Sequence, residues 1–249
     1  MQAPPVAEYT QKQVIEKTKH AAKIANKLLN EIVKFIKPGI TEREATEKTI
    51  QLYSKFGIKR NWHNPYIYFG TNTILTFKDR ASEERILQDE DIAYIDIGPI
   101  IDDIEGDVGK TLIFGNNQLF KELKLQSECI FENAVNYWRK NNSTGIELYQ
   151  HIYKLTEDAG FVFNLNPAGH LIGAFPHTGW KEGLSTYPYK VEPGYWILEI
   201  QIRHPEKIAK REMIFSVENR NFVHWKDVEK EVKELKSKIK QTVLQKTIL

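Results

Sequence analysis

Residues 92–115 read IAYIDIGPIIDDIEGDVGKTLIFG, and this stretch decides the fold of the chain. Two apolar runs rich in β-branched residues flank a short polar turn near Asp102 and Asp103, which predicts an antiparallel hairpin. Each run contains one acidic residue among apolar neighbours, Asp96 in the first and Asp107 in the second. They are eleven residues apart, so a hairpin loop of even length places both carboxylates on the same face of the sheet.

An ionised carboxylate inside an apolar segment needs a counter-charge or a metal ion. A single aspartate here could instead cap a turn or pair with a lysine such as Lys110, and structural ion pairs of that kind are common. Two carboxylates on one face of a buried hairpin are better explained by a shared cation. Such a cation would need further ligands from the rest of the chain.

The length and composition limit the class of protein. A chain of 249 residues fits one large domain, which we expect to span residues 1–249, with a lead segment at 1–8 and an amphipathic helix at 224–246. The formal net charge of +2, from 35 basic and 33 acidic residues, gives no strong field for nucleic acid or an anionic membrane.

Cysteine usage restricts the possible metal ligands and the compartment. Cys129 is the only cysteine, so the chain has neither a disulfide framework nor a thiolate zinc cluster, and oxygen and imidazole must hold any metal. The first ten residues lack a basic start followed by an apolar run, and no apolar stretch approaches membrane-spanning length. These features predict a cytoplasmic protein.

The order of the predicted elements repeats once along the chain. Apolar periodicity predicts helices near residues 8–37, 41–56, 118–140 and 144–159, and capping boxes mark two of their starts, at Thr41 with Glu44 and at Thr144 with Glu147. Residues 61–76 and 160–171 are β-prone, residues 78–91 are charged loop, and residues 196–202 and 213–223 alternate as a second antiparallel pair would. The order helix, helix, hairpin thus occurs twice, which predicts one domain with internal pseudo-symmetry.

Three further residues are candidate ligands downstream of the hairpin. His170 follows a glycine in NPAGHLIGAFPH, and Glu199 and Glu218 each interrupt an apolar strand segment, WILEIQI and FSVEN. Taken singly, the histidine could be a satisfied core residue and each glutamate could face solvent. Together with Asp96 and Asp107 they supply four carboxylates and one imidazole, which suits two divalent ions such as manganese, iron, cobalt or zinc better than calcium or magnesium.

With these candidate ligands in this order, the chain resembles the pita-bread metallopeptidases, which include methionine aminopeptidase, aminopeptidase P, prolidase and creatinase. The segments IDIGPIIDDIEGDVGKT, GHLIGAFPH, EPGYWILEIQI and SVENRNFV carry the resemblance, which extends from about residue 8 to 223. It implies an α+β fold, in which a curved antiparallel sheet with pseudo-two-fold symmetry has helices on its convex face. The early Trp-His and the later Phe-Pro-His resemble a less characterised, single-domain branch of this superfamily.

The resemblance also implies roles for individual residues. It makes Asp96 a chelating ligand of one metal and Asp107 and Glu218 bridging ligands. It makes His170 and Glu199 ligands of the other metal, and Glu199 would also handle protons. In the same way His177 would contact the scissile carbonyl. We also expect His63 and Trp180 to be substrate-binding residues, because His63 could supply an imidazole and Trp180 lies in the aromatic loop after His177.

The implied function is a dinuclear hydrolase that uses a metal-bridging hydroxide and two divalent ions, with manganese first and cobalt, iron or zinc as alternatives. Its substrate would be a small peptide, cleaved near the N-terminus by an aminopeptidase or Xaa-Pro peptidase, and a homodimer is one possible assembly. Methionine aminopeptidases and prolidases carry a histidine before the hairpin, where this chain has Thr76 or Phe77, although His63 could supply an imidazole. There are two alternatives. The chain could be a catalytically altered pita-bread domain that binds a peptide or protein partner, or it could hydrolyse a non-peptide C–N bond.

Overall fold

The computed structural model describes residues 11–76, 78–164, 168–176, 182–191, 196–205 and 215–221, with residues 11–12 and 215–221 described by their backbone alone. The helices are α1 Gln11–Phe35, α2 Glu42–Lys55, α3 Gln118–Asn141 and α4 Gly145–Asp158, with short 3-10 turns η1 Gly70–Ile74 and η2 Leu184–Thr186. The strands are β1 Asn61–Phe69, β2 Ile92–Ile101, β3 Ile104–Glu105, β4 Val108–Ile113, β5 Val162–Phe163, β6 Gly169–Leu171, β7 Trp196–Arg203 and β8 Phe215–Asn221. The predicted lead segment and the predicted helix at 224–246 lie outside the described residues.

The predicted hairpin is present and sets the register of the first sheet. β2 and β4 pair antiparallel with Asp96 opposite Gly109, so Asp107 falls on the same face as Asp96, as the spacing predicted. The turn consists of Asp102 and Asp103 at φ of 50° and 64°, between the paired residues Ile101 and Ile104. A two-residue turn with both φ values positive matches the twist of the strands it joins.

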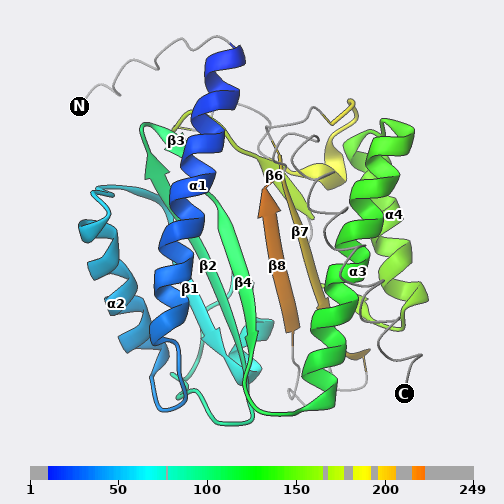
Figure 1. The fold of residues 1–249 in the computed structure, drawn as a ribbon. Helices are drawn as coiled ribbons and strands as arrows, with labels where there is room; N and C mark the ends of the chain where they lie inside the picture. Colours follow the sequence, from blue (N-terminus) through cyan, green and yellow to red (C-terminus); the bar gives the residue numbers. More distant parts are fainter. Residues whose placement is uncertain are drawn as a thin grey trace, which may run out of the picture.

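The strands form two four-stranded antiparallel sheets that meet at β4 and β8. In the first sheet β2 pairs with β1, β3 and β4, and in the second β7 pairs with β5, β6 and β8. Figure 1 shows β4 next to β8, and residues of these two strands are in contact. The predicted pairing of segment 196–202 with segment 213–223 is confirmed by the β7–β8 ladder.

The two halves repeat each other in detail. Both predicted capping boxes are present, on Thr41 at the start of α2 and on Thr144 at the start of α4. Thr41 also forms an isolated bridge with Ile86 before β2, and Thr144 forms one with Lys190 before β7. Because 103 residues separate Thr41 from Thr144 and likewise Asp96 from Glu199, the two acidic residues occupy corresponding places in the two halves.

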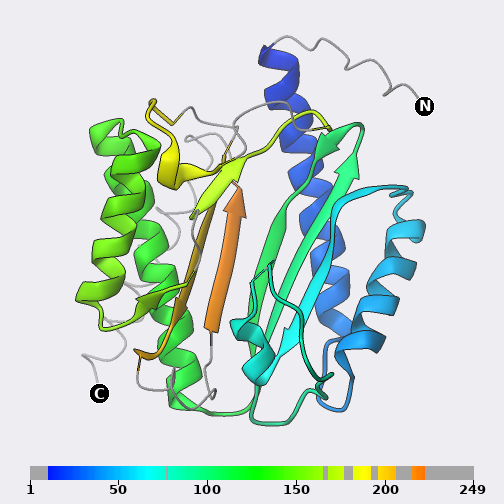
Figure 2. The ribbon, with the colours of Figure 1, turned by 180° about the vertical axis from the view of Figure 1, so that it is seen from behind.

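Each sheet buries one face against its own pair of helices. Ala93, Ile95 and Ile97 of β2 belong to a core with residues of α1 and α2, and Leu198 and Ile200 of β7 belong to a core with residues of α3 and α4. Side chains alternate along a strand, so Asp96 and Glu199 point away from these helices. Figure 1 shows α1 crossing the first sheet, and Figure 2 shows the opposite face.

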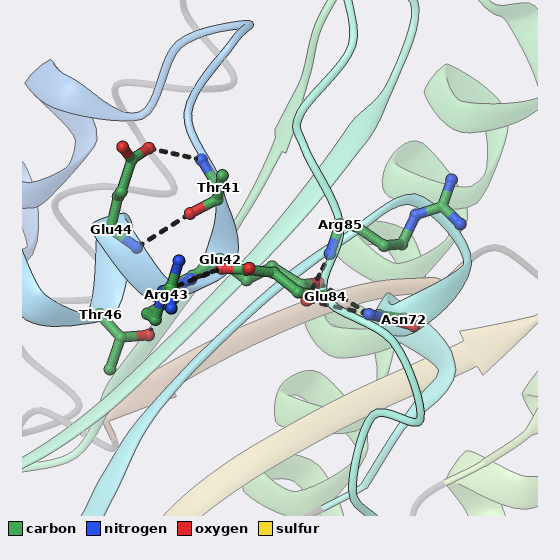
Figure 3. A network of polar contacts seen from close by, with 8 residues as sticks. All are labelled: Thr41, Glu42, Arg43, Glu44, Thr46, Asn72, Glu84 and Arg85. Carbon is green, nitrogen blue, oxygen red and sulfur yellow. Dashed lines mark hydrogen bonds and ion pairs between the residues drawn. The ribbon is translucent and has the colours of Figure 1, made fainter.

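A buried carboxylate ties the connection before β2 to α2 (Figure 3). Glu42 is 7% exposed, and its oxygens accept hydrogen bonds from the backbone N–H groups of Phe69 and Arg85 and from the side-chain amide of Asn72. Burial raises the pKa of Glu42, although these hydrogen bonds oppose the rise. The contacts hold the end of β1 and the segment leading into β2 in place. Within the described residues, no helix is long and apolar enough to span a membrane.

Candidate metal centre

The hairpin presents two carboxylates that the protein satisfies only in part. Asp96 is 8% exposed and Asp107 is 1% exposed. The hydroxyl of Tyr94 donates a hydrogen bond of 2.9 Å to Asp96 Oδ2, whereas Oδ1 of each aspartate is buried without a hydrogen-bond partner. Native proteins rarely leave buried polar atoms unpaired, so each such atom needs an explanation. Two unpaired carboxylate oxygens on one face are what a cation site requires.

His170 reaches this face from the second sheet. It lies on β6, where Gly169 has a φ of 140° and where a Cβ would come within 2.1 Å of the Ile197 carbonyl oxygen, so only glycine allows this approach. His170 Nε2 lies 2.9 Å from Asp107 Oδ2. Its Nδ1 lies 2.9 Å from the Leu171 carbonyl oxygen, to which it donates. The imidazole is therefore aimed at the hairpin carboxylate.

His63 approaches the same face from the other side, on β1. Its Nε2 lies 3.7 Å from Asp96 Oδ1, and its Nδ1 lies 2.7 Å from the Asn64 carbonyl oxygen. The indole of Trp62 lies between the two histidines, with ring centroids 4.3 Å from His63 and 5.1 Å from His170. The two imidazoles thus flank the hairpin carboxylates.

The ligand-type atoms of five residues fall into two groups. One atom each from His63, Asp96 and Asp107 lie within 4.8 Å of one another, and so do atoms from Asp107, His170 and Glu199. Asp107 belongs to both groups. A carboxylate has two oxygens, so this arrangement suits two divalent ions that share one aspartate, held by the oxygen and imidazole ligands that borderline metals accept.

The charges of this site perturb one another strongly. Burial raises the pKa of Asp96 to about 6, with the neighbouring Asp107 also raising it and His63 opposing the rise. Burial alone would lower the pKa of His170, but the hydrogen bond and charge of Asp107, with the charge of Glu199, raise it to about 10. Burial also raises the pKa of Tyr94 well above its usual value, which keeps its hydroxyl a donor to Asp96. Without a metal, the proton on His170 offsets negative charge beside it.

The structure brings together four of the five predicted metal ligands: Asp96, Asp107, His170 and Glu199. Of the fifth, Glu218, the structure places the backbone on β8 opposite Ile200. The predicted substrate residues His177 and Trp180 lie outside the described residues, as does Phe77.

Trp62 and Tyr94 also belong to the site, although they are not among the residues that the sequence predicts as metal ligands. Tyr94 precedes Asp96 by two positions on a strand, so alternation places both on one face and could have identified it. Trp62 is held by a hydrogen bond of 2.9 Å from its Nε1 to the Gly106 carbonyl oxygen, a contact across 44 residues. No local pattern in the sequence indicates such a contact.

Comparison with known proteins points to one family. The family model described as metallopeptidase family M24 matches residues 16–242. Over 170 residues the chain is 25% identical to a methionine aminopeptidase of Clostridium acetobutylicum, covering 66% of this chain and 67% of that protein. It is 28% identical over 181 residues to an uncharacterised peptidase of Staphylococcus haemolyticus, covering 71% of this chain and 47% of that protein.

Solved structures share the fold. The prolidase from Pyrococcus furiosus matches with a TM-score of 0.70 at 19% identity, covering 84% of this chain and 60% of the prolidase. Aminopeptidase P from E. coli, solved with the inhibitor Pro-Leu, matches with a TM-score of 0.69 at 15% identity, covering 87% of this chain and 56% of that one. The chain thus spans a little over half the length of these structures, and the predicted α+β pita-bread fold is confirmed.

Proposed function

The chain belongs to metallopeptidase family M24, and from this premise we propose that it is a dinuclear metal-dependent hydrolase that cleaves small peptides near their N-terminus. The observation that carries the proposal is the pair of ligand groups that share Asp107, in which Asp96 and Asp107 each have one buried oxygen without a hydrogen bond. We propose manganese as the metal, with cobalt, iron or zinc as alternatives.

Each ligand residue has a role in this proposal. Asp96 would hold one ion, His170 and Glu199 would hold the other, and Asp107 and Glu218 would be shared between the two. Two divalent ions, when bound, lower the pKa of water and polarise the scissile carbonyl. The buried position of Asp96 and Asp107 supports this assignment, because metal charge offsets the cost of ionising both carboxylates in an apolar setting.

The remaining chemistry falls to side chains around the ligands. Glu199 lies on the strand face that holds the ligands and can pass a proton to the leaving nitrogen, a general acid–base role. We assign to His177 a hydrogen bond to the carbonyl oxygen as negative charge develops on it, and to Trp180 a contact with the substrate. His177 and Trp180 lie outside the described residues. The resemblance to the family supports the role of His177, and the place of Trp180 three residues after His177 supports a contact with the substrate.

The substrate class rests on the named relatives. Relatives of this chain include a methionine aminopeptidase, and structures of its fold include a prolidase and an aminopeptidase P. We propose an unblocked peptide as the substrate, with or without proline after the scissile bond. A single cysteine, Cys129, agrees with the reducing cytoplasm that we propose as the location.

The proposal is tested by peptide hydrolysis. Metal-free protein is reconstituted with Mn²⁺ and incubated with two peptide libraries, one with methionine first and one with proline second. We expect release of the first residue that EDTA abolishes and that Asp107→Ala lacks. Asp158→Ala serves as the control, because Asp158 is an exposed acid paired with Lys154 on α4. Metal-dependent release that Asp107→Ala retains, or no release from either library, would overturn the proposal.

A further inference from the structure

We infer that His63 is a metal ligand, whose Nε2 coordinates the same ion as Asp96 and Asp107. The inference rests on the proposed function and extends it, because the ligand set proposed above gives an imidazole to only one of the two ions. His63 would give the other ion an imidazole of its own. It would therefore act as a ligand and not as a contact to the substrate.

The protonation of the ring supports this role. His63 Nδ1 lies 2.7 Å from the Asn64 carbonyl oxygen, which can only accept a hydrogen bond. Nδ1 therefore carries the proton, and in the neutral ring Nε2 carries the lone pair that a metal requires. His170 shows the same arrangement, with Nδ1 at 2.9 Å from the carbonyl oxygen of the next residue and Nε2 facing a buried aspartate. Metal-binding histidines usually have their second nitrogen fixed in this way.

The backbone around His63 is shaped to aim its ring. The β1–β2 ladder changes register on both sides of His63, and such irregularities re-aim a side chain. The residue opposite His63 is Gly98, and a Cβ on Gly98 would come within 2.3 Å of the His63 ring. The ring therefore occupies the space that a side chain at position 98 would fill. The Tyr66 ring stacks on the His63 ring, with ring centroids 5.1 Å apart.

A structural ion pair explains the geometry less well. The distance of 3.7 Å from His63 Nε2 to Asp96 Oδ1 is longer than a hydrogen bond, and Oδ1 is buried without a hydrogen-bond partner. A pair that existed for stability would close this gap, because burying unpaired polar atoms is costly. Two lone-pair donors that face each other without a hydrogen bond are what a shared cation requires.

The chain offers a matched control for this contact. His20 Nε2 on α1 also lies 3.7 Å from an aspartate oxygen, Asp102 Oδ2, but both side chains are more than half exposed. The side chains of His63 and Asp96 are 11% and 12% exposed. The two pairs have the same residue types and the same separation, so burial beside Asp107 is what distinguishes the candidate ligand.

The test measures metal binding by the whole chain. Wild type, His63→Ala, His170→Ala and His20→Ala are titrated with Mn²⁺ by equilibrium dialysis, and folding is checked by circular dichroism. We expect His63→Ala to weaken binding of one ion by more than the roughly 10- to 100-fold that outer-shell partners cost. His170→Ala weakens the other ion, and His20→Ala binds as wild type does.

A spectroscopic measurement separates a ligand from a neighbour. In the His170→Ala protein loaded with one Mn²⁺, electron spin-echo modulation should show an imidazole nitrogen, which His63→Ala in the same background removes. Gly98→Ala, which displaces the ring without removing it, should reduce this signal.

The outcomes also separate this inference from the proposed function. If wild type and His63→Ala bind two ions equally well, or if no nitrogen modulation is seen, the inference is overturned while the metallohydrolase stands. If wild type binds no metal, both fail together.

Discussion

Replacing Asp96 by asparagine should stabilise the metal-free protein while destroying its metal site. Burial raises the pKa of Asp96 from its ordinary value of 3.8 to about 6. The folded protein therefore binds this proton more tightly than the unfolded chain does, so its stability falls as the pH rises from 3.8 through about 6. Asparagine cannot ionise, and its amide oxygen can still accept the hydrogen bond that Tyr94 donates to Asp96.

The magnitude follows from the shift in pKa. The raised pKa of Asp96 lowers the free energy of unfolding of the metal-free protein by about 3 kcal/mol at pH 8. At pH 5 the loss is roughly half as large. For a chain of 249 residues, 3 kcal/mol raises the melting temperature by roughly 6–12 °C. We expect the melting temperature of metal-free Asp96→Asn to exceed that of metal-free wild type by up to this amount.

Thermal unfolding in EDTA at pH 5 and pH 8, followed by circular dichroism, measures this difference. Asp158→Asn is the control, because it neutralises an exposed acid paired with Lys154 and should change stability by less than about 0.5 kcal/mol. Adding Mn²⁺ should reverse the order, since only wild type gains stability from binding. An Asp96→Asn protein that is less stable than wild type in EDTA at both pH values would refute the reasoning.

Three further predictions concern the metal site and the buried carboxylate before β2. Tyr94→Phe removes the hydroxyl that orients Asp96, so Mn²⁺ affinity measured by dialysis should fall by about 10- to 100-fold, and unchanged affinity would contradict this role. His170 has a pKa of about 10, so it must lose its proton to bind a metal. Calorimetry of Mn²⁺ binding in two buffers at pH 8 should detect about one proton released per chain from this residue, and the affinity for Mn²⁺ should rise towards pH 9. The His170→Ala protein should not release this proton, and a variant that still releases it would contradict the prediction. Glu42→Ala leaves buried N–H donors unpaired, so the free energy of unfolding measured in urea should fall by about 3 kcal/mol. Glu44→Ala in the neighbouring capping box should lower it by about 1 kcal/mol or less, and equal losses in the two variants would contradict the prediction.

The sequence predicted the parts of the site that depend on local periodicity. The hairpin, the shared face of Asp96 and Asp107, and both capping boxes follow from alternation and from side-chain chemistry within a few residues. The repeated order of helix, helix and hairpin, which predicted internal pseudo-symmetry, is also present in the structure. These features need no knowledge of tertiary packing.

The sequence could not predict contacts that depend on how distant strands pack. His63 comes beside Asp96 only because the β1–β2 ladder shifts register on both sides of it and because Gly98 leaves room for its ring. His170 reaches Asp107 because Gly169 lets β6 approach β7 closely, and the following segment pairs with the hairpin tip through Ala174 and Ile104. Glycines inside strands were the available signal for both approaches, since they often mark close passage of another group.

The number of Mn²⁺ ions bound per chain, measured by native mass spectrometry on wild type and Asp107→Ala, tests the central claim most directly. Asp107 belongs to both groups of ligand atoms, so it should be needed for both ions. We predict about two ions on wild type and none held at the same free Mn²⁺ concentration by Asp107→Ala, with the fold unchanged. Wild type that stays metal-free, or an Asp107→Ala protein that keeps both ions, would contradict a shared-carboxylate centre.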